Sequence, residues 1–369
     1  MTTVQAKPSA VAASASAAPL LEIRNATKQF GGGYFSGRPP TVALDDVSFS
    51  IPQDRPSITA IAGESGSGKT TLARILLGIL TPTSGSVSYR GKDVRKMSGA
   101  ERRQFRREVQ PIFQDPFESY NPFYKVDHVL TTPARNFKVG KNRADVRRKV
   151  NEALEAVGLQ PSETLGRFPH QLSGGQRQRV MVARALLLRP KVILADEPVS
   201  MVDASLRATI LDSIFTLNRE LGISVIYITH DLTTAYQISD NIVVLYRGSV
   251  AEAGAVEHVI KDPRHPYTQL LVQSIPQPDP KKRWGEIHAR GDADHDGASA
   301  GCKFADRCPY MMDMCTQKAP PLYQTDQHRV VSCFLHREAK VAASSDVTTI
   351  FAPPAATARS QASSITTST

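Results

Sequence analysis

Three short apolar runs separate the polar motifs of this chain. They are ITAIA at 58–62, KVILAD at 191–196 and SVIYIT at 224–229. Runs of this length that are rich in β-branched residues predict buried strands. The first run leads into a glycine-rich loop and then into TLARILLGIL at 71–80, whose apolar residues have helical spacing. The order strand, loop and helix gives that glycine-rich loop a specific structural context.

The loop reads GESGSGKT at 63–70 and matches the pattern G-x-x-x-x-G-K-[ST] of a phosphate-binding loop, or P-loop. Glycines let backbone N–H groups wrap around phosphate oxygens, and the helix N-terminus adds a favourable dipole. Lys69 is expected to reach the β- and γ-phosphates, and Thr70 to ligate Mg²⁺. The residues expected to bind the nucleotide here are Gly63, Ser65, Gly66, Gly68, Lys69, Thr70 and Thr71.

Polar residues follow the other two predicted strands. Asp196 and Glu197 end the second run, where an acidic residue is needed to hold the Mg²⁺ shell. Asp196 fits that role, and Glu197 is placed to act as general base toward a water. His230 ends the third run and is expected to contact the γ-phosphate and Glu197. Gln114, in VQPIFQDP, is a candidate to reach Mg²⁺ or the attacking water.

The composition changes this picture mainly at the chain ends. Residues 1–19 and 338–369 are rich in Ala, Ser and Thr, and we expect both to be disordered. No window approaches 18 apolar residues, and the N-terminus lacks the apolar core of a signal peptide, so we expect a cytosolic protein.

The net charge of +10 is partly local, with seven basic residues at 92–110. That run indicates either a solvated helix face or a surface turned toward lipid headgroups.

The motifs GESGSGKT, IFQDP, LSGGQ, VILADEP, SMVD and ITHD, in this order, resemble the nucleotide-binding subunit of an ABC transporter. The resemblance covers roughly residues 20–337. It implies an α/β fold, namely a P-loop ABC-type nucleotide-binding domain with a mixed sheet and a helical subdomain, followed by a small Cys-containing extension. The implied boundaries are 20–262 for the nucleotide-binding domain, about 115–188 for its helical subdomain and 263–337 for the extension. Lys69, Gln114, Glu197 and His230 are the implied catalytic residues, with ATP and Mg²⁺ as ligands and Thr70, Gln114 and Asp196 around the Mg²⁺.

LSGGQ at 172–176 corresponds to the family signature, which meets the γ-phosphate held by a second subunit. Ser173, Gly174, Gly175 and Gln176 would serve that second site, and Ser173 can also cap the following helix. One P-loop and one signature imply a dimer with two shared ATP sites. Asp203 is implied in a contact across the dimer. Phe30 is the expected aromatic against adenine, with Tyr34 and Phe35 as competitors.

HPYT at 265–268 and the following cysteine segment resemble the C-terminal extension of ATPases that serve oligopeptide and dipeptide importers. The implied partners are a second ABC ATPase subunit (a copy or a sister), two transmembrane permease subunits and an extracytoplasmic substrate-binding protein. The implied location is the cytoplasmic face of the cell (inner) membrane, as a peripheral subunit. An oligosaccharide or nickel importer remains the alternative, because relatives of this extension serve those solutes too.

The four cysteines, Cys302, Cys308, Cys315 and Cys333, all lie within the extension at spacing C-x5-C-x6-C-x17-C. A reducing cytosol argues against disulfides and favours a metal site. The spacing lacks the C-x2-C pair of common zinc sites, so a [4Fe–4S] cluster is the first candidate. The other two interpretations are a zinc site and free structural thiols.

A nucleic-acid-associated ATPase of the same superfamily is the rival from another functional class, because the chain is basic. Such proteins usually carry two nucleotide domains or long insertions between the motifs. Here there is one P-loop, and the distance from Gln114 to the signature is short. We therefore expect no nucleic-acid partner. A second rival is a C-terminal segment that senses iron or redox state, in addition to transport.

Overall fold

The computed structural model describes residues 18–31, 40–114, 120–200, 202, 204–275 and 300–353. The core is a sheet of nine strands in the order β13-β11-β12-β10-β9-β3-β8-β7-β6. The five strands from β9 to β6 run parallel to one another, and β10, β12, β11 and β13 continue the sheet from β9 with antiparallel pairing. The bounds of the parallel strands are β3 (Ile58–Ala62), β6 (Val109–Ile112), β7 (Val192–Asp196), β8 (Ser224–Thr229) and β9 (Asn241–Tyr246).

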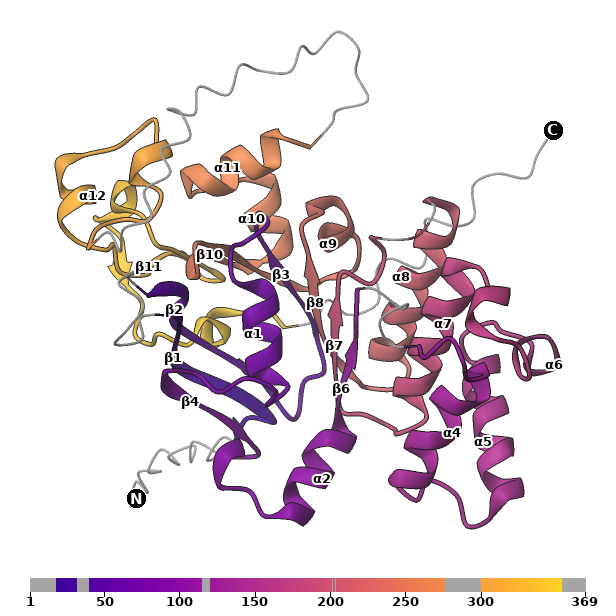
Figure 1. The fold of residues 1–369 in the computed structure, drawn as a ribbon. Helices are drawn as coiled ribbons and strands as arrows, with labels where there is room; N and C mark the ends of the chain where they lie inside the picture. The colour runs from indigo at the N-terminus through magenta and orange to yellow at the C-terminus, as the bar shows by residue number, and fades with distance from the viewer. Residues whose placement is uncertain are drawn as a thin grey trace, which may run out of the picture.

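The three predicted strands are confirmed as β3, β7 and β8. Every residue of β3 and β8 is buried, which is why these parallel strands read as continuous apolar runs rather than alternating ones. Helices cover the sheet on both sides (Figure 1). The helices of the core are α1 (Lys69–Leu76), α2 (Gly99–Glu108), α8 (Ala204–Arg219), α9 (Leu232–Ile238) and α10 (Val256–Lys261).

A second sheet of four antiparallel strands lies beside α1, in the order β2-β1-β4-β5 (Figure 1). Its strands are β1 (Leu21–Phe30), β2 (Thr41–Ile51), β4 (Ser84–Tyr89) and β5 (Lys92–Asp93), with a 3-10 turn, η1, at Val94–Lys96. The basic run forms η1 and α2. Phe105 is the buried residue of α2, and the surrounding arginines Arg102, Arg103, Arg106 and Arg107 are exposed. These arginines therefore project from an exposed helix face that one apolar side chain holds against the protein.

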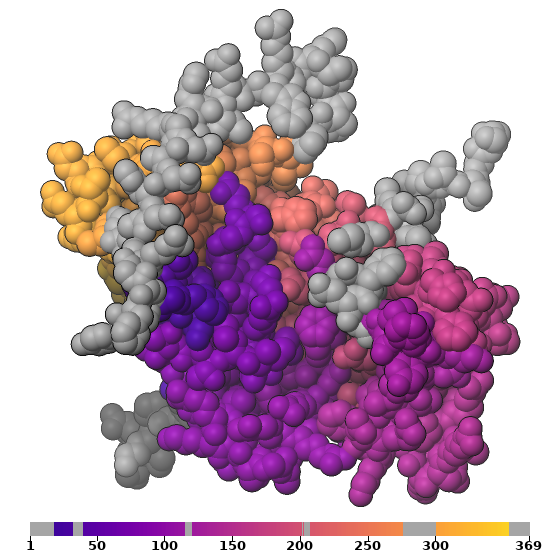
Figure 2. All heavy atoms as spheres, viewed as in Figure 1, coloured from indigo at the N-terminus to yellow at the C-terminus, as the bar shows by residue number. Residues whose placement is uncertain are grey.

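Helices between β6 and β7 form a lobe on the far side of the core from the N-terminal sheet (Figures 1 and 2). They pack through their apolar faces into a cluster that also includes residues of β6, β7 and β8. Because this cluster continues into the core sheet, the lobe is not a separate hydrophobic unit. Its elements are α4 (Val126–Asn136), α5 (Arg143–Glu155), α6 (Pro161–Thr164), η2 (Pro169–Gln171) and α7 (Gly174–Leu186).

The C-terminal extension continues the core sheet. β12 pairs with β10, with Glu252 opposite Val331, and β11 and β13 follow outward. Figure 2 shows the extension, in orange to yellow, lying against the N-terminal strands on the side away from the helical lobe. β10 (Ser249–Ala255) is the core strand that it pairs with. The elements that follow are α11 (Pro266–Gln273), η3 (Ala305–Arg307), α12 (Asp313–Gln317), β11 (Tyr323–Asp326), β12 (Arg329–Val331), η4 (Phe334–His336), β13 (Lys340–Val341) and η5 (Val347–Ile350).

The expectation of a disordered tail over 338–369 is wrong for residues 338–353. Val347 is buried, and the ring centroid of Phe351 lies 6.4 Å from that of Phe49 in β2. Asp346 caps η5 and accepts a hydrogen bond from the Ser50 hydroxyl at 2.8 Å. A few apolar anchors and one cap therefore order a segment whose composition is otherwise that of a tail. The remaining predicted tails, 1–17 and 354–369, lie outside the described residues.

Candidate active site

The P-loop connects the end of β3 to the first residue of α1. Gly63 has φ 149° and Gly68 has φ 102°, both in the region that favours glycine. A Cβ at Gly68 would lie 2.5 Å from the carbonyl oxygen of Ala43, so no other residue fits there without moving the backbone. Ser67 N–H donates to the Glu64 carbonyl at 3.1 Å and closes the turn. The loop is therefore a defined concave turn at a helix N-terminus, which is the geometry of an anion site.

Lys69 is the first residue of α1 and is buried. Its Nζ donates to the carbonyl oxygens of Gly63 at 2.7 Å and Glu64 at 2.8 Å. Burial lowers the pKa of Lys69, and the negative charges of Glu197, Asp196 and Glu64 oppose that shift. The ammonium group is thus held inside the loop and faces the carboxylates at the end of β7.

The carboxylate pair stands where β7 ends. Burial, followed by the charge of Glu197, raises the pKa of Asp196, while Lys69 and Arg74 lower it. Glu197 has φ 45°, an uncommon conformation for a residue with a side chain. Its N–H donates to the Ile228 carbonyl at 2.9 Å, which holds this turn against β8. A residue held in such a conformation marks a place where the fold imposes a side-chain direction.

Two further predicted residues meet Glu197. Nδ1 of His230 lies 3.0 Å from Glu197 Oε1, and Gln114 Nε2 donates to Glu197 Oε2 at 2.9 Å. The three residues follow β8, β6 and β7, which are neighbours in the sheet. Because parallel strands end at the same edge, residues separated by more than eighty positions converge on one carboxylate. Such a carboxylate can accept a proton from a bound water.

The predicted Mg²⁺ site can be checked against the oxygen-bearing side chains at this edge of the sheet. Thr70 supplies a hydroxyl on the exposed side of α1, Asp196 a carboxylate and Gln114 an amide oxygen. Oxygen donors of this kind suit Mg²⁺, which binds through one or two carboxylates and substrate phosphates. The mutual repulsion of Asp196 and Glu197 is the unfavourable contact that a cation would relieve. The donor set therefore fits the ion.

The signature segment begins α7. Ser173 Oγ accepts from Gln176 N–H at 3.2 Å, and Gln176 Oε1 accepts from Ser173 N–H at 3.0 Å. This reciprocal capping box satisfies two of the free N–H groups at the helix start and confirms the predicted cap. α7 lies in the helical lobe, and α1 lies on the other side of β7 (Figure 1). The signature and the P-loop of one chain are thus on different parts of the molecule.

Phe30 is the last residue of β1. Its side chain is 44% exposed, and Lys28 Nζ lies 5.2 Å from the ring centroid. An exposed ring at the edge of the N-terminal sheet is free to stack on a planar ligand. The competing Tyr34 and Phe35 lie outside the described residues, as does Asp203.

The four cysteines are free thiols, three of them buried and Cys302 half-buried. Cys302 N–H donates to the Cys315 carbonyl at 2.7 Å, and the two side chains pack against apolar clusters of the extension. Burial raises the pKa of Cys302 to about 11 and that of Cys333 to about 12, which favours the protonated thiol. Among the residues that the structure describes, no group of three or more His, Cys, Asp or Glu side chains is arranged to hold a metal ion. The structure gives no support to the expected iron–sulfur cluster or to zinc.

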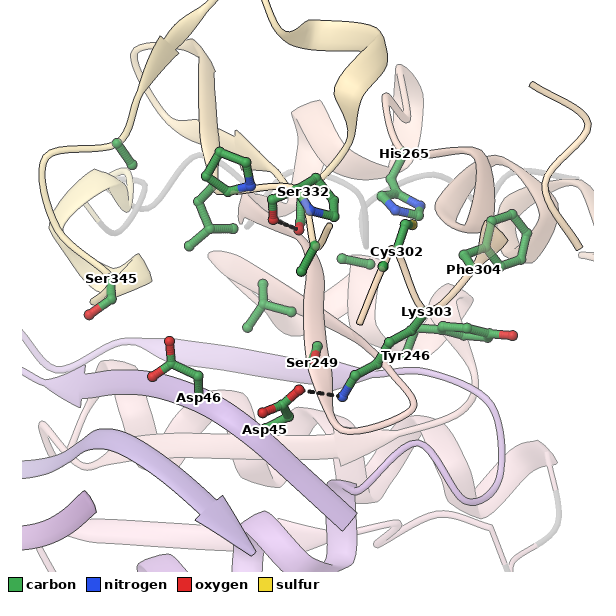
Figure 3. Close-up of a pocket in the computed structure, with 18 of the residues that line it drawn as sticks. Asp45, Asp46, Tyr246, Ser249, His265, Cys302, Lys303, Phe304, Ser332 and Ser345 are labelled. Carbon is green, nitrogen blue, oxygen red and sulfur yellow. Dashed lines mark hydrogen bonds and ion pairs between the residues drawn. The ribbon is translucent and has the colours of Figure 1, made fainter. Parts of the chain in front are cut away.

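A cavity of about 560 Å³ opens between the N-terminal sheet and the extension (Figure 3). Asp45 and Asp46 line it from β2, and Cys302, Lys303 and Ser332 line it from the extension. The P-loop does not contribute to its wall, so this cavity is separate from the site at the end of β3.

Two side chains of the extension reach the P-loop, and the sequence did not assign either to this site. Tyr267 and Arg307 both bond to Glu64, the second residue of the loop. Tyr267 belongs to the HPYT motif, so the motif itself was the available signal. Arg307 stands between two cysteines, and nothing in its local sequence indicates a contact with a residue 243 positions away.

No helix among the described residues is long and apolar enough to span a lipid bilayer.

Comparison with known proteins agrees with this geometry. Residues 44–200 match the family model described as "ABC transporter", and residues 251–315 match "Oligopeptide/dipeptide transporter, C-terminal region". The chain is 37% identical to "Probable peptide ABC transporter ATP-binding protein y4tS" of Sinorhizobium fredii over 88% of this chain and 92% of that protein. It is 38% identical to "Di/tripeptide transport ATP-binding protein DppF" of Pseudomonas aeruginosa over 84% of this chain and 96% of that protein.

Among solved structures, the chain resembles the ATP-binding cassette MJ0796, described as a dimer in a post-hydrolysis state bound to ADP and Pi. The TM-score is 0.57 at 28% identity, over 64% of this chain and 98% of that one. The matched fold and motifs make this protein an ATPase. The chain therefore belongs to the ABC transporter family, among the ATP-binding proteins that carry the oligopeptide/dipeptide transporter C-terminal region.

Proposed function

We propose that this protein hydrolyses ATP to power the import of oligopeptides or dipeptides through a membrane permease. The observation that carries the hydrolytic part is the convergence of His230 and Gln114 on Glu197 at the edge of the sheet. The cargo is supported by the matched C-terminal region and by relatives whose names state peptide transport.

The working assembly contains two ATPase subunits, either two copies or this chain and a sister. Supporting this, one chain holds one P-loop and one signature on different parts of the molecule (Figure 1). In a dimer, Ser173, Gly175 and Gln176 of one subunit would face the phosphates bound at the other subunit's P-loop. The helix N-terminus and its backbone N–H groups suit that role. Two permease subunits and an extracytoplasmic binding protein complete the importer, with this subunit at the cytoplasmic face of the membrane.

In the reaction, Glu197 accepts the proton of the attacking water. His230 and Gln114 hold the two carboxylate oxygens, so the base keeps one orientation as the water approaches. Lys69 directs its ammonium at the phosphates and balances the charge that develops there. Mg²⁺, held through Thr70, Asp196 and Gln114, would neutralise further phosphate charge. Phe30 would stack on adenine and fix the other end of the nucleotide.

Uptake in cells tests this proposal. We would replace the gene by the Glu197→Gln variant and measure uptake of a labelled tripeptide, a labelled β-linked oligosaccharide and Ni²⁺. Loss of tripeptide uptake alone supports the peptide assignment, because only the ATP-dependent route is disabled. Loss of oligosaccharide or Ni²⁺ uptake alone would overturn the cargo and leave the ATPase assignment in place. Glu163→Gln, the same change at an exposed position of α6, is the matched control.

A further inference from the structure

Glu64 is held by two separate contacts from the C-terminal extension. Arg307 Nη1 donates to Glu64 Oε2 at 2.9 Å and Nη2 to Oε1 at 3.1 Å, so the two planar groups pair through both oxygens. The Glu64 backbone N–H donates to the hydroxyl oxygen of Tyr267 at 2.8 Å. The extension therefore forms hydrogen bonds with both the side chain and the backbone of one P-loop residue.

The position of Tyr267 is fixed by the HPYT motif. His265 caps α11 by accepting the Tyr267 N–H on Nδ1 at 3.0 Å, and Pro266 occupies the first helical position, where no N–H is needed. The Tyr267 ring is fully buried, with its centroid 4.5 Å from Tyr246 and 5.6 Å from Phe304. A rigid, buried ring thus carries one hydroxyl to the P-loop.

Arg307 is held by the same aromatic cluster. Its guanidinium carbon lies 5.9 Å from the Tyr246 ring centroid and 5.8 Å from that of Phe304. Four residues earlier, Lys303 pairs with Asp45 at 2.9 Å (Figure 3) and donates to the Arg247 carbonyl at 2.9 Å. The stacked guanidinium and the anchored lysine leave this segment little freedom to move away from the P-loop.

The turn that Lys303 holds is itself in contact with the P-loop. Gly248 N–H donates to the Ser67 carbonyl at 2.9 Å, and Asp45 N–H donates to the Gly248 carbonyl at 2.9 Å. Lys303 therefore supports the loop indirectly through Asp45, while Arg307 and Tyr267 support it directly. The extension thus reaches Glu64 directly through Arg307 and Tyr267, and Ser67 indirectly from Lys303 through Asp45 and Gly248.

We propose that Arg307 and Tyr267 are positioning residues for ATP binding, through which the C-terminal extension holds the P-loop in its phosphate-binding shape. The inference rests on the proposed nucleotide site at this loop. Arg307 also neutralises the Glu64 carboxylate, which would otherwise repel the phosphates. The negative charge of Glu64 is close enough to Lys69 to oppose the lowering of the Lys69 pKa, so it is felt where the phosphates would bind.

An ordinary surface ion pair would contribute little to holding the P-loop in place, because water screens the attraction between exposed charges. This pair differs in three respects. The Arg307 side chain is only 20% exposed, the pairing uses both terminal guanidinium nitrogens, Nη1 and Nη2, and the Glu64 N–H donates an independent hydrogen bond to Tyr267. Planar pairing through two bonds fixes geometry as well as charge.

The test uses the purified full-length chain with MgATP. Binding of a fluorescent ATP analogue and steady-state hydrolysis are measured for wild type, Arg307→Gln, Glu64→Gln and the double variant. Arg307→Gln should raise the Kd and the KM for ATP by about three- to tenfold, with kcat within about twofold. The double variant should bind ATP more tightly than Arg307→Gln, because no unpaired carboxylate remains. Tyr267→Phe should raise KM by a smaller factor.

Matched controls separate this effect from general damage to the extension. Arg337→Gln changes an exposed arginine of the extension, and Tyr323→Phe changes a buried tyrosine there. Both should leave KM unchanged. Arg307→Lys keeps the positive charge but cannot pair with both carboxylate oxygens in the same planar geometry. It replaces Arg307→Gln in the test if that variant does not fold. An unchanged ATP affinity in a folded Arg307 variant would overturn the inference.

Lys69→Ala distinguishes this result from failure of the nucleotide site itself. If Lys69→Ala binds ATP as well as wild type, the P-loop assignment fails together with the inference that depends on it. If Lys69→Ala abolishes binding while Arg307→Gln has no effect, only the role of the extension is lost.

Discussion

Glu197 and His230 lie 3.0 Å apart, Oε1 to Nδ1, at the ends of two neighbouring parallel strands. The Glu197 side chain is 15% exposed, whereas that of His230 is 60% exposed. The carboxylate is therefore fixed within the protein, and the histidine covers it from the solvent side. An arrangement of this kind presents a base whose direction is set before any substrate arrives.

Replacing Glu197 by Gln should lower kcat for ATP hydrolysis by about 100-fold or more, because the amide cannot accept the proton of water. ATP binding should persist, since the amide keeps the size of the side chain and removes a negative charge near the phosphates. Phosphate release and binding of a fluorescent ATP analogue, measured on the same sample, check both parts. A variant that hydrolyses ATP at the wild-type rate would remove Glu197 from the role of base.

Replacing His230 by Ala should reduce kcat by about 100-fold while the Kd for ATP changes little. The reason is that His230 contacts the base at Oε1, whereas the P-loop binds the phosphates. His258→Ala is a matched control, because His258 is also half-exposed and lies on α10, outside the site. Parallel loss of ATP affinity in His230→Ala would instead place the histidine in nucleotide binding.

Local sequence patterns predicted the parts of the site that are close in sequence to a buried strand. ITAIA and SVIYIT match β3 and β8 residue for residue, because fully buried parallel strands contain no charged residues and are rich in β-branched ones. Glu197 follows the predicted strand β7 and His230 follows β8, so both lie at one sheet edge. Glu197 and His230 could therefore be named before their contacts were seen, whereas Gln114 was named from its motif and the family resemblance.

The role of the extension could not be predicted in the same way. Pairing of Glu252 with Val331, and of Glu64 with Arg307, joins residues far apart in sequence and leaves no periodic signal. Composition was misleading for residues 338–353. Their many Ala, Ser and Thr residues predicted a disordered tail, whereas a single buried side chain such as Val347 leaves no mark on the composition. Cysteine spacing alone also could not decide between a ligand set and buried thiols.

Replacing Val347 by Ala should lower the free energy of unfolding by about 1–2 kcal/mol, because a buried side chain against β2 is shortened. The shift in the midpoint of thermal unfolding measures it. Val341→Ala removes the same atoms from a side chain that is 51% exposed and should have no effect. Identical melting of Val347→Ala and wild type would show that the Val347 side chain does not stabilise the fold.

Replacing His265 by Asn should protect the protein against acid. Burial lowers the pKa of His265 to about 3 from 6.5, so the folded state holds the imidazole neutral. Its contribution to stability is complete above pH 6.5 and is lost as the pH falls toward 3. Asn can still accept the Tyr267 N–H but does not titrate. The difference in unfolding free energy between wild type and variant, measured by urea unfolding, should therefore fall by a few kcal/mol between pH 7 and pH 4.

Replacing Glu252 by Gln should give the opposite pH dependence. Burial raises the pKa of Glu252 to about 7 from 4.5, although the N–H groups of His265 and Arg264 partly counter it. The folded state thus binds a proton more tightly than the unfolded chain, and this stability is lost as the pH rises through 7.

Gln keeps a carbonyl for the two N–H groups and does not titrate. The stability of wild type relative to Glu252→Gln should therefore fall by about 3 kcal/mol between pH 4 and pH 8, measured by urea unfolding at each pH. A constant difference across this range would mean that Glu252 has the same pKa in the folded protein as in the unfolded chain, near 4.5. The Arg329 side chain, with Nη1 4.0 Å from Glu252 Oε1, would then be the group that stabilises the charge.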